Sequence, residues 1–313
     1  MEAPSPSSVA PKKTGASRFI LVWSVRLLRD AVICYLGVVL VFYVIQNRFV
    51  FPGSGTTQGQ HDAIIFPNVE YDLLSLPLPD GRKIAAVYGT ALDERGHKLP
   101  DTHSRPTVVY FYSNGSCMAY SMDVFRDLRY LGVNVIVPEY EGYGMSPGSP
   151  SERGCYATAD AAYDFLLTRK EIDSQKIVAM GWSMGAAVAI DLASRRPTAG
   201  LITVSAFSTL PAVGREFFPW LPMSLIFRYR FDNIEKIAQI SCPIMLVHGR
   251  SDELVPFWME GELAKAAKGK VTIFNVAGAG HNDVFDKGGG YLYEQFGAFL
   301  DQLTPKTAAT HGD

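Results

Sequence analysis

Short apolar runs alternate with amphipathic stretches along most of this chain. Residues 177–180 and 244–247, for example, are continuously apolar, as is typical of strands buried on both faces of a sheet. Helix-prone stretches separate most of these runs, so the pattern predicts an α/β fold: a mostly parallel eight-stranded sheet with helices on both faces. The expected strands cover residues 70–74, 84–88, 108–112, 134–138, 177–180, 201–204, 244–248 and 271–276.

The last expected helix has one apolar face, which we expect to pack on the sheet. Its apolar residues are Leu292, Phe296, Phe299, Leu300 and Leu303. The two ends of the chain have a different composition, because residues 1–18 are rich in Pro and Ser and residues 304–313 carry no apolar periodicity. We expect both ends to be disordered.

An uninterrupted apolar run near the N-terminus covers residues 31–45. It is shorter than the roughly 20 residues of a membrane span, but flanking arginines can extend to the interface, and Phe49, Val50 and Phe51 add apolar and aromatic side chains. A helix over about residues 27–48 would just cross a bilayer. The alternatives are a buried helix and a cleaved signal peptide, although no small-residue cleavage site precedes Pro52.

Positive charge is denser before this run than after it. The bias predicts a cytoplasmic N-terminus, with the remaining domain on the other side of the membrane. The expected organisation is therefore a membrane anchor region over residues 19–51 and one domain over residues 52–303. The basic residues before the run are Lys12, Lys13, Arg18, Arg26 and Arg29, whereas Arg48 follows it closely.

The sequence Gly-Trp-Ser-Met-Gly, residues 181–185, lies where an apolar strand gives way to an Ala-rich helical run. A serine between two glycines at such a junction fits the nucleophile elbow, a turn too tight for side chains at the flanking positions. The pattern alone is short enough to occur by chance. It identifies Ser183 as a candidate nucleophile that needs a base and an acid.

The base and the acid are expected downstream, at the carboxyl ends of later strands. Asp252 follows the expected strand 244–248, and His281 follows the expected strand 271–276 in a loop of small residues. Glu253 is a competing acid one position further on. His248, at the end of its strand, lies on the wrong side of the acid in chain order, so we interpret it as structural.

Several segments together carry the pattern of one family, at residues 139–152, 181–185, 231–237, 242–252 and 280–283. They resemble the α/β-hydrolase serine hydrolases of the membrane-anchored, hydrolase-domain-containing branch, which includes protein depalmitoylases and lysophospholipid or monoacylglycerol lipases. The resemblance covers about residues 48–303. It implies the α/β-hydrolase fold and a triad of Ser183, Asp252 and His281.

The chain departs from this family after the third strand. The family usually has His-Gly-Asn-Ala there, whereas this chain has Tyr112, Ser113, Asn114 and Gly115. The aligned oxyanion donors are the backbone N–H groups of Asn114 and Met184. Because serine does not adopt the positive φ of glycine cheaply, the departure puts the geometry in doubt. A shifted register would make Gly115 or Ser116 the donor.

An insertion over about residues 207–240 is dense in aromatic residues. It could form a lid that binds an acyl chain, or a helix that packs its apolar face on the core. Trp182, beside the candidate nucleophile, is open to the same two interpretations.

The composition adds little to the chemistry. With 313 residues, 48% hydrophobic residues and a net charge of −2, the chain can bury a sizeable core and has no basic footprint for nucleic acid. No His/Cys spacing fits a metal site and no glycine-rich phosphate loop occurs, so we expect neither metal nor cofactor. The resemblance implies cleavage of acyl esters or thioesters through an acyl-enzyme. The alternative is a weakly active or non-catalytic binding protein at the membrane.

Overall fold

The computed structural model describes residues 15–54 and 70–303. The chain divides into two compact units, Met1–Gln46 and Asn47–Asp313. Helix α1 (Gly15–Val50) makes up the described part of the first unit and ends in the second. Its segment Phe19–Val50 is long and apolar enough to cross a membrane.

Helix α1 is longer than the expected helix over residues 27–48. It begins at Gly15, inside the segment expected to be disordered, and no proline occurs between Gly15 and Pro52 to interrupt it. The rest of that segment, residues 1–14, and the expected disordered tail, residues 304–313, lie outside the described residues.

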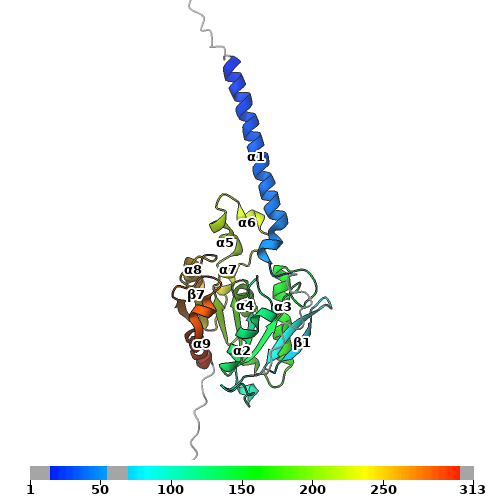
Figure 1. Ribbon diagram of the computed structural model, residues 1–313, viewed down its shortest axis with the longest axis vertical. Coiled ribbons are helices and arrows are strands. Elements are labelled where there is room, and N and C mark those ends of the chain that lie inside the picture. Colours follow the sequence, from blue (N-terminus) through cyan, green and yellow to red (C-terminus); the bar gives the residue numbers. More distant parts are fainter. Residues whose placement is uncertain (1–14, 55–69, 304–313) are drawn as a thin grey trace, which may run out of the picture. The chain divides into compact units, whose positions relative to one another are not determined.

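The second unit is built on one eight-stranded sheet with the order β1-β2-β4-β3-β5-β6-β7-β8 (Figure 1). Strand β2 is antiparallel to β1 and β4, and the remaining pairs are parallel. The expected mostly parallel sheet is confirmed, and the largest boundary difference is in β1. The strands are β1 (Asp72–Pro77), β2 (Lys83–Gly89), β3 (Thr107–Phe111), β4 (Asn134–Pro138), β5 (Ile177–Trp182), β6 (Gly200–Val204), β7 (Ile244–Gly249) and β8 (Val271–Val276).

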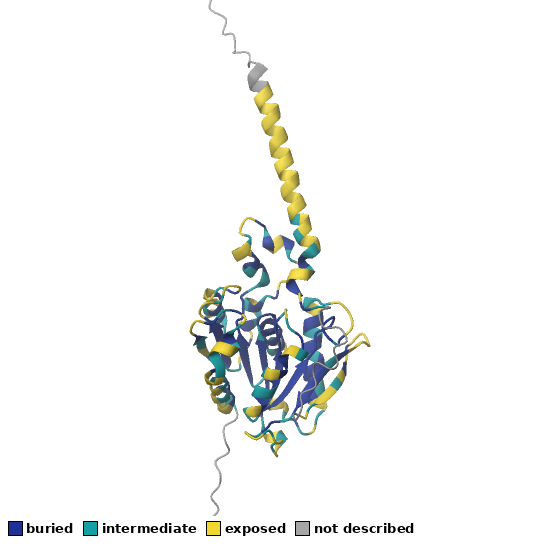
Figure 2. Cartoon of the chain, viewed as in Figure 1, coloured by how far each residue is buried: buried dark blue, intermediate teal, exposed yellow. Residues whose placement is uncertain are grey.

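Helices cover both faces of this sheet, and its central strands are the most buried part of the unit (Figure 2). Helix α4 packs on β3, β5 and β6 and contacts α3 and α7, whereas α9 packs on β6, β7 and β8. The helices are α2 (Met122–Tyr130), α3 (Glu152–Thr168), α4 (Met184–Arg195), α5 (Leu210–Phe217), α6 (Met223–Ile226), α7 (Asn233–Ile237), α8 (Trp258–Ala266) and α9 (Val284–Leu303). Short 3-10 turns are η2 (Thr102–Ser104), η3 (Ala119–Ser121) and η4 (Ser174–Lys176).

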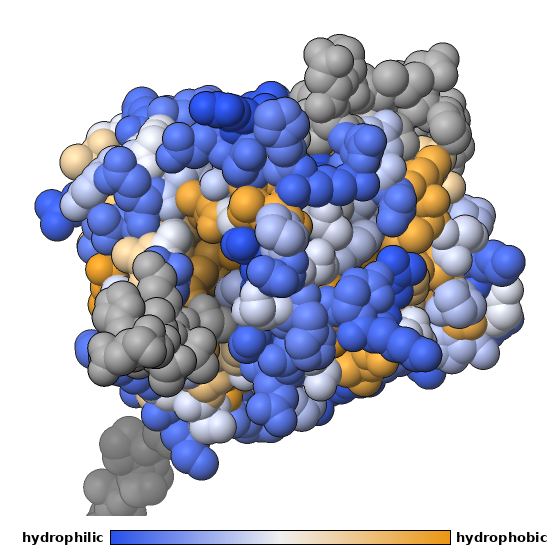
Figure 3. Space-filling view, turned by 90° about the horizontal axis from the view of Figure 1, so that it is seen from below, coloured by the Kyte–Doolittle hydropathy of each residue, from blue (hydrophilic) through white to orange (hydrophobic). Residues whose placement is uncertain are grey.

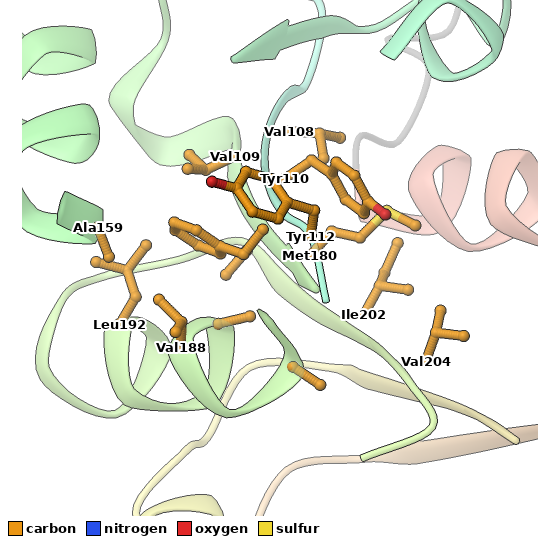
Figure 4. Packing of buried hydrophobic residues seen from close by; sticks show 14 of the residues in the cluster. Val108, Val109, Tyr110, Tyr112, Ala159, Met180, Val188, Leu192, Ile202 and Val204 are labelled. Atoms are coloured by element: carbon orange, nitrogen blue, oxygen red, sulfur yellow. The ribbon is translucent and has the colours of Figure 1, made fainter. Parts of the chain in front are cut away.

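The core lies between the central strands and these helices. Val108 and Tyr110 of β3, Met180 of β5 and Ile202 of β6 are fully or almost fully buried, as is Val188 of α4 (Figure 4). Burial of each large apolar side chain stabilises the fold by about 1.5–3 kcal/mol. The expected apolar face of the last helix is confirmed, since its buried residues include Leu292, Phe296, Phe299 and Leu300.

Candidate active site

Ser183 occupies a tight turn between β5 and α4. Its backbone has φ 56° and ψ −116°, and its N–H donates to the Val204 carbonyl at 2.8 Å. A positive φ at a residue other than glycine costs of order 1–3 kcal/mol and marks stored backbone strain. A Cβ atom at Gly181 would lie 2.0 Å from the Gly185 carbonyl oxygen, and one at Gly185 would lie 2.0 Å from the Phe111 carbonyl oxygen. Both flanking positions therefore require glycine, as the sequence predicted for a nucleophile elbow.

His281 lies between the serine and the acid. Its Nε2 is 2.9 Å from Ser183 Oγ, and its Nδ1 is 2.8 Å from Asp252 Oδ2. Because an ionised carboxylate only accepts hydrogen bonds, Nδ1 must carry the proton and donate it. Nε2 is then the unprotonated nitrogen and accepts the hydrogen bond from the serine hydroxyl. This tautomer is the one that a base for Ser183 needs.

Asp252 is held by backbone donors as well as by the imidazole. Its Oδ1 accepts hydrogen bonds from the N–H groups of Leu254 at 3.0 Å and Val255 at 2.7 Å. Burial raises the pKa of this carboxyl, but hydrogen bonds from His248 and His281 and the nearby backbone outweigh that effect and hold the pKa well below its usual value. Asp252 is therefore ionised at neutral pH.

The structure separates the two candidate acids. Asp252 contacts the His281 imidazole, whereas a carboxylate oxygen of Glu253 lies 3.3 Å from the His281 backbone nitrogen and accepts a hydrogen bond from that N–H. Glu253 is exposed. The geometry thus gives Asp252 the position of a triad acid and gives Glu253 a part in shaping the loop.

His248 contacts the acid, which sequence reasoning missed. Its Nε2 lies 3.3 Å from Asp252 Oδ2 and 3.0 Å from the Val255 carbonyl oxygen, and the residue is 1% exposed. Both neighbours accept hydrogen bonds, so Nε2 carries the proton and is shared between them. The spacing of four residues before the acid, at a strand end, is the signal that could have indicated this contact.

Replacing His248 by phenylalanine is expected to lower kcat by about 10- to 100-fold, the effect of losing one hydrogen bond to a charged group. KM should not change, because His248 acts through Asp252 and does not line the cavity. His248→Gln keeps an N–H donor and should recover part of the loss. Steady-state kinetics beside melting temperatures test this, and equal kcat losses in the two variants would contradict a positioning role.

The residues that carry the two expected oxyanion donors line the cavity that contains Ser183. Asn114 and Met184 line one cavity with Ser183 and His281. Within residues 15–54 and 70–303, neither backbone N–H donates to a protein acceptor. Met184 is the first residue of α4, where the N–H has no partner within the helix.

The strain expected at Ser113 is absent. Residues other than glycine with positive φ in the described chain are Asp101, Ser183, Ser205 and Phe231, so Ser113 does not need the glycine conformation. The preceding Tyr112, which replaces the family histidine, is buried, and its hydroxyl donates to Glu139 Oε1 at 2.6 Å. Burial raises the pKa of Glu139, although its hydrogen bonds with Tyr112 and backbone N–H groups counter part of that effect. This buried contact fixes the start of the loop without a histidine.

Replacing Asn114 by proline removes one expected oxyanion donor and should lower kcat by about 10²–10³-fold. Asn114→Ala keeps the N–H and is expected to cost far less, although it also removes the hydrogen bond from Nδ2 to the Val50 carbonyl at 3.0 Å. Melting temperatures must stay unchanged for the comparison to count. Near-normal activity in Asn114→Pro would move the donor to Gly115 or Ser116, and equal losses would assign the effect to the side chain.

The cavity beside Ser183 has a volume of about 220 Å³ and a mostly apolar lining. Residues Leu210, Val213 and Phe217 of α5 contribute to it, whereas Met223 and Ile226 of α6 are buried in packing. Within the insertion over residues 207–240, some residues thus line the cavity, as a lid would, whereas others pack on the core. Trp182 is not in the lining and packs against Phe285 with ring centroids 5.5 Å apart. Apolar lining residues outside α5 are Phe49, Val50, Met184, Phe207, Phe231, Leu254 and Val255.

Other features of the surface lack comparable chemistry. A larger hollow of about 510 Å³ between β1 and α3 contains none of the candidate catalytic groups. In the part of the chain that the structure describes, no group of three or more His, Cys, Asp or Glu side chains could hold a metal ion.

Known proteins similar to this chain include α/β hydrolases. A model of the α/β hydrolase family matches residues 111–232. An uncharacterized protein of Mycobacterium tuberculosis is 32% identical over 250 residues, which cover 79% of this chain and 84% of that protein. α/β hydrolase domain-containing protein 17B of Xenopus laevis is 35% identical over 173 residues, which cover 55% of this chain and 56% of that protein.

Solved esterase structures share the fold. An esterase of Pyrococcus furiosus superposes with a TM-score of 0.61 and 21% identity, covering 75% of this chain and 91% of that one. Acetyl xylan esterase from Paenibacillus sp. R4 gives a TM-score of 0.58 and 15% identity, covering 82% and 98%. Together with the strand order and the elbow described above, these findings show that the chain belongs to the α/β-hydrolase family.

Proposed function

We propose that the protein is a serine hydrolase that cleaves carboxylic ester or thioester bonds of acyl, lipid-like substrates through an acyl-enzyme. The family and its esterase neighbours support a hydrolase in general. The observation that carries the finer assignment is the continuous contact from Ser183 through His281 to Asp252, at 2.9 Å and 2.8 Å. A buried serine with this partner order has the means to become nucleophilic at neutral pH.

In the proposed reaction, Ser183 Oγ attacks the substrate carbonyl while His281 Nε2 takes the hydroxyl proton. Asp252 holds the imidazole in the required tautomer and stabilises the imidazolium that forms. The N–H groups of Asn114 and Met184 donate to the tetrahedral oxyanion. Collapse expels the alcohol or thiol, which receives the proton from His281, and water then releases the acid by the same route.

The apolar lining of the cavity supports an acyl group as the part of the substrate that it holds. Its volume of about 220 Å³ lies below the roughly 300–1,000 Å³ of pockets for drug-sized ligands, so a long chain would continue out of the cavity. A series of esters with one leaving group and increasing acyl length tests this. We expect kcat/KM to rise with length until the cavity is full and then to level off, and rates independent of length would argue against an acyl pocket.

We further propose that α1 anchors the protein as a single span. None of the most apolar part of the helix is buried, which is the exposure that a lipid-embedded helix would have. A cleaved signal sequence has similar length and composition, and resistance of the full-length chain to carbonate extraction distinguishes the two. The excess of basic residues before the span favours a cytoplasmic N-terminus and an extracytoplasmic catalytic domain.

A further inference from the structure

The cavity that holds Ser183 is walled partly by the end of α1. Phe49 and Val50, the last two residues of that helix, belong to the same compact unit as the sheet and line the cavity. The Val50 carbonyl accepts a hydrogen bond from Asn114 Nδ2, and Phe51 packs against Tyr229 with ring centroids 5.0 Å apart. The end of the helix is thereby fixed to the oxyanion loop and to the insertion after β6.

A second set of contacts strengthens this attachment. Asn47 Oδ1 accepts hydrogen bonds from Arg228 Nη2 and the Tyr229 hydroxyl, each at 2.9 Å. The segment 47–51 therefore contributes Phe49 and Val50 to the wall of the cavity and is also the exit of the proposed anchor. The two hydrogen bonds of Asn47 join sequence positions more than 180 residues apart.

The apolar run of the helix ends only a few residues before this wall, so the wall would lie close to a bilayer boundary. The uninterrupted apolar run ends at Ile45, and Phe49 follows four residues later, a rise of about 6 Å along a helix. Arg48, between them, is exposed and suits the interfacial level, where a long basic side chain reaches the headgroups. This step rests on the proposed anchoring, because it needs the helix to lie in the membrane.

The mouth of the cavity is lined by exposed apolar side chains. Phe49 is 59% exposed and Phe217 is 48% exposed, although both line the cavity. Beyond Phe217, Trp220 and Leu225 are 56% and 83% exposed in the connection between α5 and α6 and in α6 itself. An enzyme that took its substrate from water would gain nothing from such a cluster, which favours association or aggregation.

The charge of this segment also suits a lipid surface. Residues 210–230 contain three arginines and one glutamate, so basic side chains accompany the exposed aromatic residues. Aromatic and basic side chains together are typical of the membrane interface. In contrast, hydrophilic side chains dominate the face of the domain seen from below, with apolar residues mainly in the recesses between them (Figure 3).

We propose that the mouth of the cavity lies in the membrane surface, with Phe217, Trp220 and Leu225 inserted among the lipids, and that the acyl substrate enters directly from the bilayer. The exposed apolar residues then replace water contacts with lipid contacts. A long acyl chain passes from the bilayer to Ser183 without crossing water. The partner of this surface is a lipid bilayer.

Tryptophan quenching tests the insertion without relying on catalysis. The full-length protein is reconstituted into vesicles of phosphatidylcholine and phosphatidylserine, with or without bromine atoms on the upper part of the acyl chains. Trp23 lies in the proposed span and is quenched in every variant, so the test is the difference between variants: the emission lost in Trp220→Phe should be a further component that brominated lipid quenches. Trp182→Phe is the matched control, because Trp182 packs against Phe285 inside the domain and its component should not be quenched. Equal Trp220 emission in both kinds of vesicle would overturn the proposal.

A kinetic comparison tests the route of the substrate. Leu225→Ser should lower hydrolysis of a long-chain ester embedded in the vesicles by about 10-fold and leave hydrolysis of a short water-soluble ester unchanged, because Leu225 is outside the cavity lining. Tyr291→Ser, at a 61% exposed position on α9, should change neither. Unchanged or equally reduced rates for both esters in Leu225→Ser would overturn the proposal. Failure of the proposed hydrolase itself would instead abolish both rates in the unmodified protein, with quenching of Trp220 retained.

Discussion

Replacement of Ser183 by alanine is expected to lower kcat for ester hydrolysis by about 10⁵–10⁶-fold, which is loss of the reaction in most assays. The hydroxyl oxygen is the atom that would bond to the substrate, and among the residues that the structure describes His281 has no other nucleophile at hydrogen-bond distance. Folding should change little, because the hydroxyl makes one side-chain hydrogen bond and the elbow backbone is kept. Hydrolysis rates beside melting temperatures measure both effects.

Ser205 provides a matched control for this change. It is also a buried serine with positive φ, and it follows the neighbouring strand β6. Its hydroxyl has no hydrogen-bond partner among the described residues, and it does not line the cavity. Ser205→Ala should therefore keep near-normal turnover. Undiminished turnover in Ser183→Ala would refute the assignment of the nucleophile.

Replacement of Asp252 by asparagine should lower kcat by about 10³–10⁴-fold. The asparagine amide can donate to Nδ1 of His281, which stabilises the tautomer with its proton on Nε2 and removes the acceptor for the Ser183 hydroxyl. The loss of negative charge also leaves the imidazolium of the transition state without its partner. Steady-state kinetics of the purified variant measure the loss.

Glu253→Gln is the control for the acid, one residue away. Its carboxylate accepts a hydrogen bond from the His281 backbone and does not contact the imidazole, so we expect a small effect on kcat. If Glu253→Gln lost activity and Asp252→Asn kept it, the acid would be assigned one residue too early.

Local sequence pattern predicted most of the fold and the candidate triad. The apolar runs placed all eight strands, and the two glycines around Ser183 identified the elbow, because both signals depend on a few neighbouring residues. The family order of serine, acid and base then identified Asp252 and His281. Their mutual distances are a property of the fold, which brings together the ends of β5, β7 and β8.

Contacts between distant parts of the chain could not be predicted in this way. The wall that Phe49 and Val50 contribute to the cavity depends on packing against residues far along the chain, and periodicity carries no information about it. The contact between His248 and Asp252 was missed because chain order alone was used to judge the histidine. The doubt about Ser113 arose from the missing glycine, whereas the buried bond between Tyr112 and Glu139 holds the loop in an ordinary conformation.

The central claim is that Ser183 forms a covalent acyl-enzyme, and labelling with a fluorophosphonate tests it most directly. Such probes bond to a serine that a neighbouring base has activated, so a non-catalytic binding protein of the same fold would remain unlabelled. Peptide mass spectrometry of the treated full-length protein should find one adduct, on Ser183. The adduct should be absent in Ser183→Ala and should form much more slowly in Asp252→Asn. A folded protein without an adduct, or with its adduct on another residue, would contradict the account.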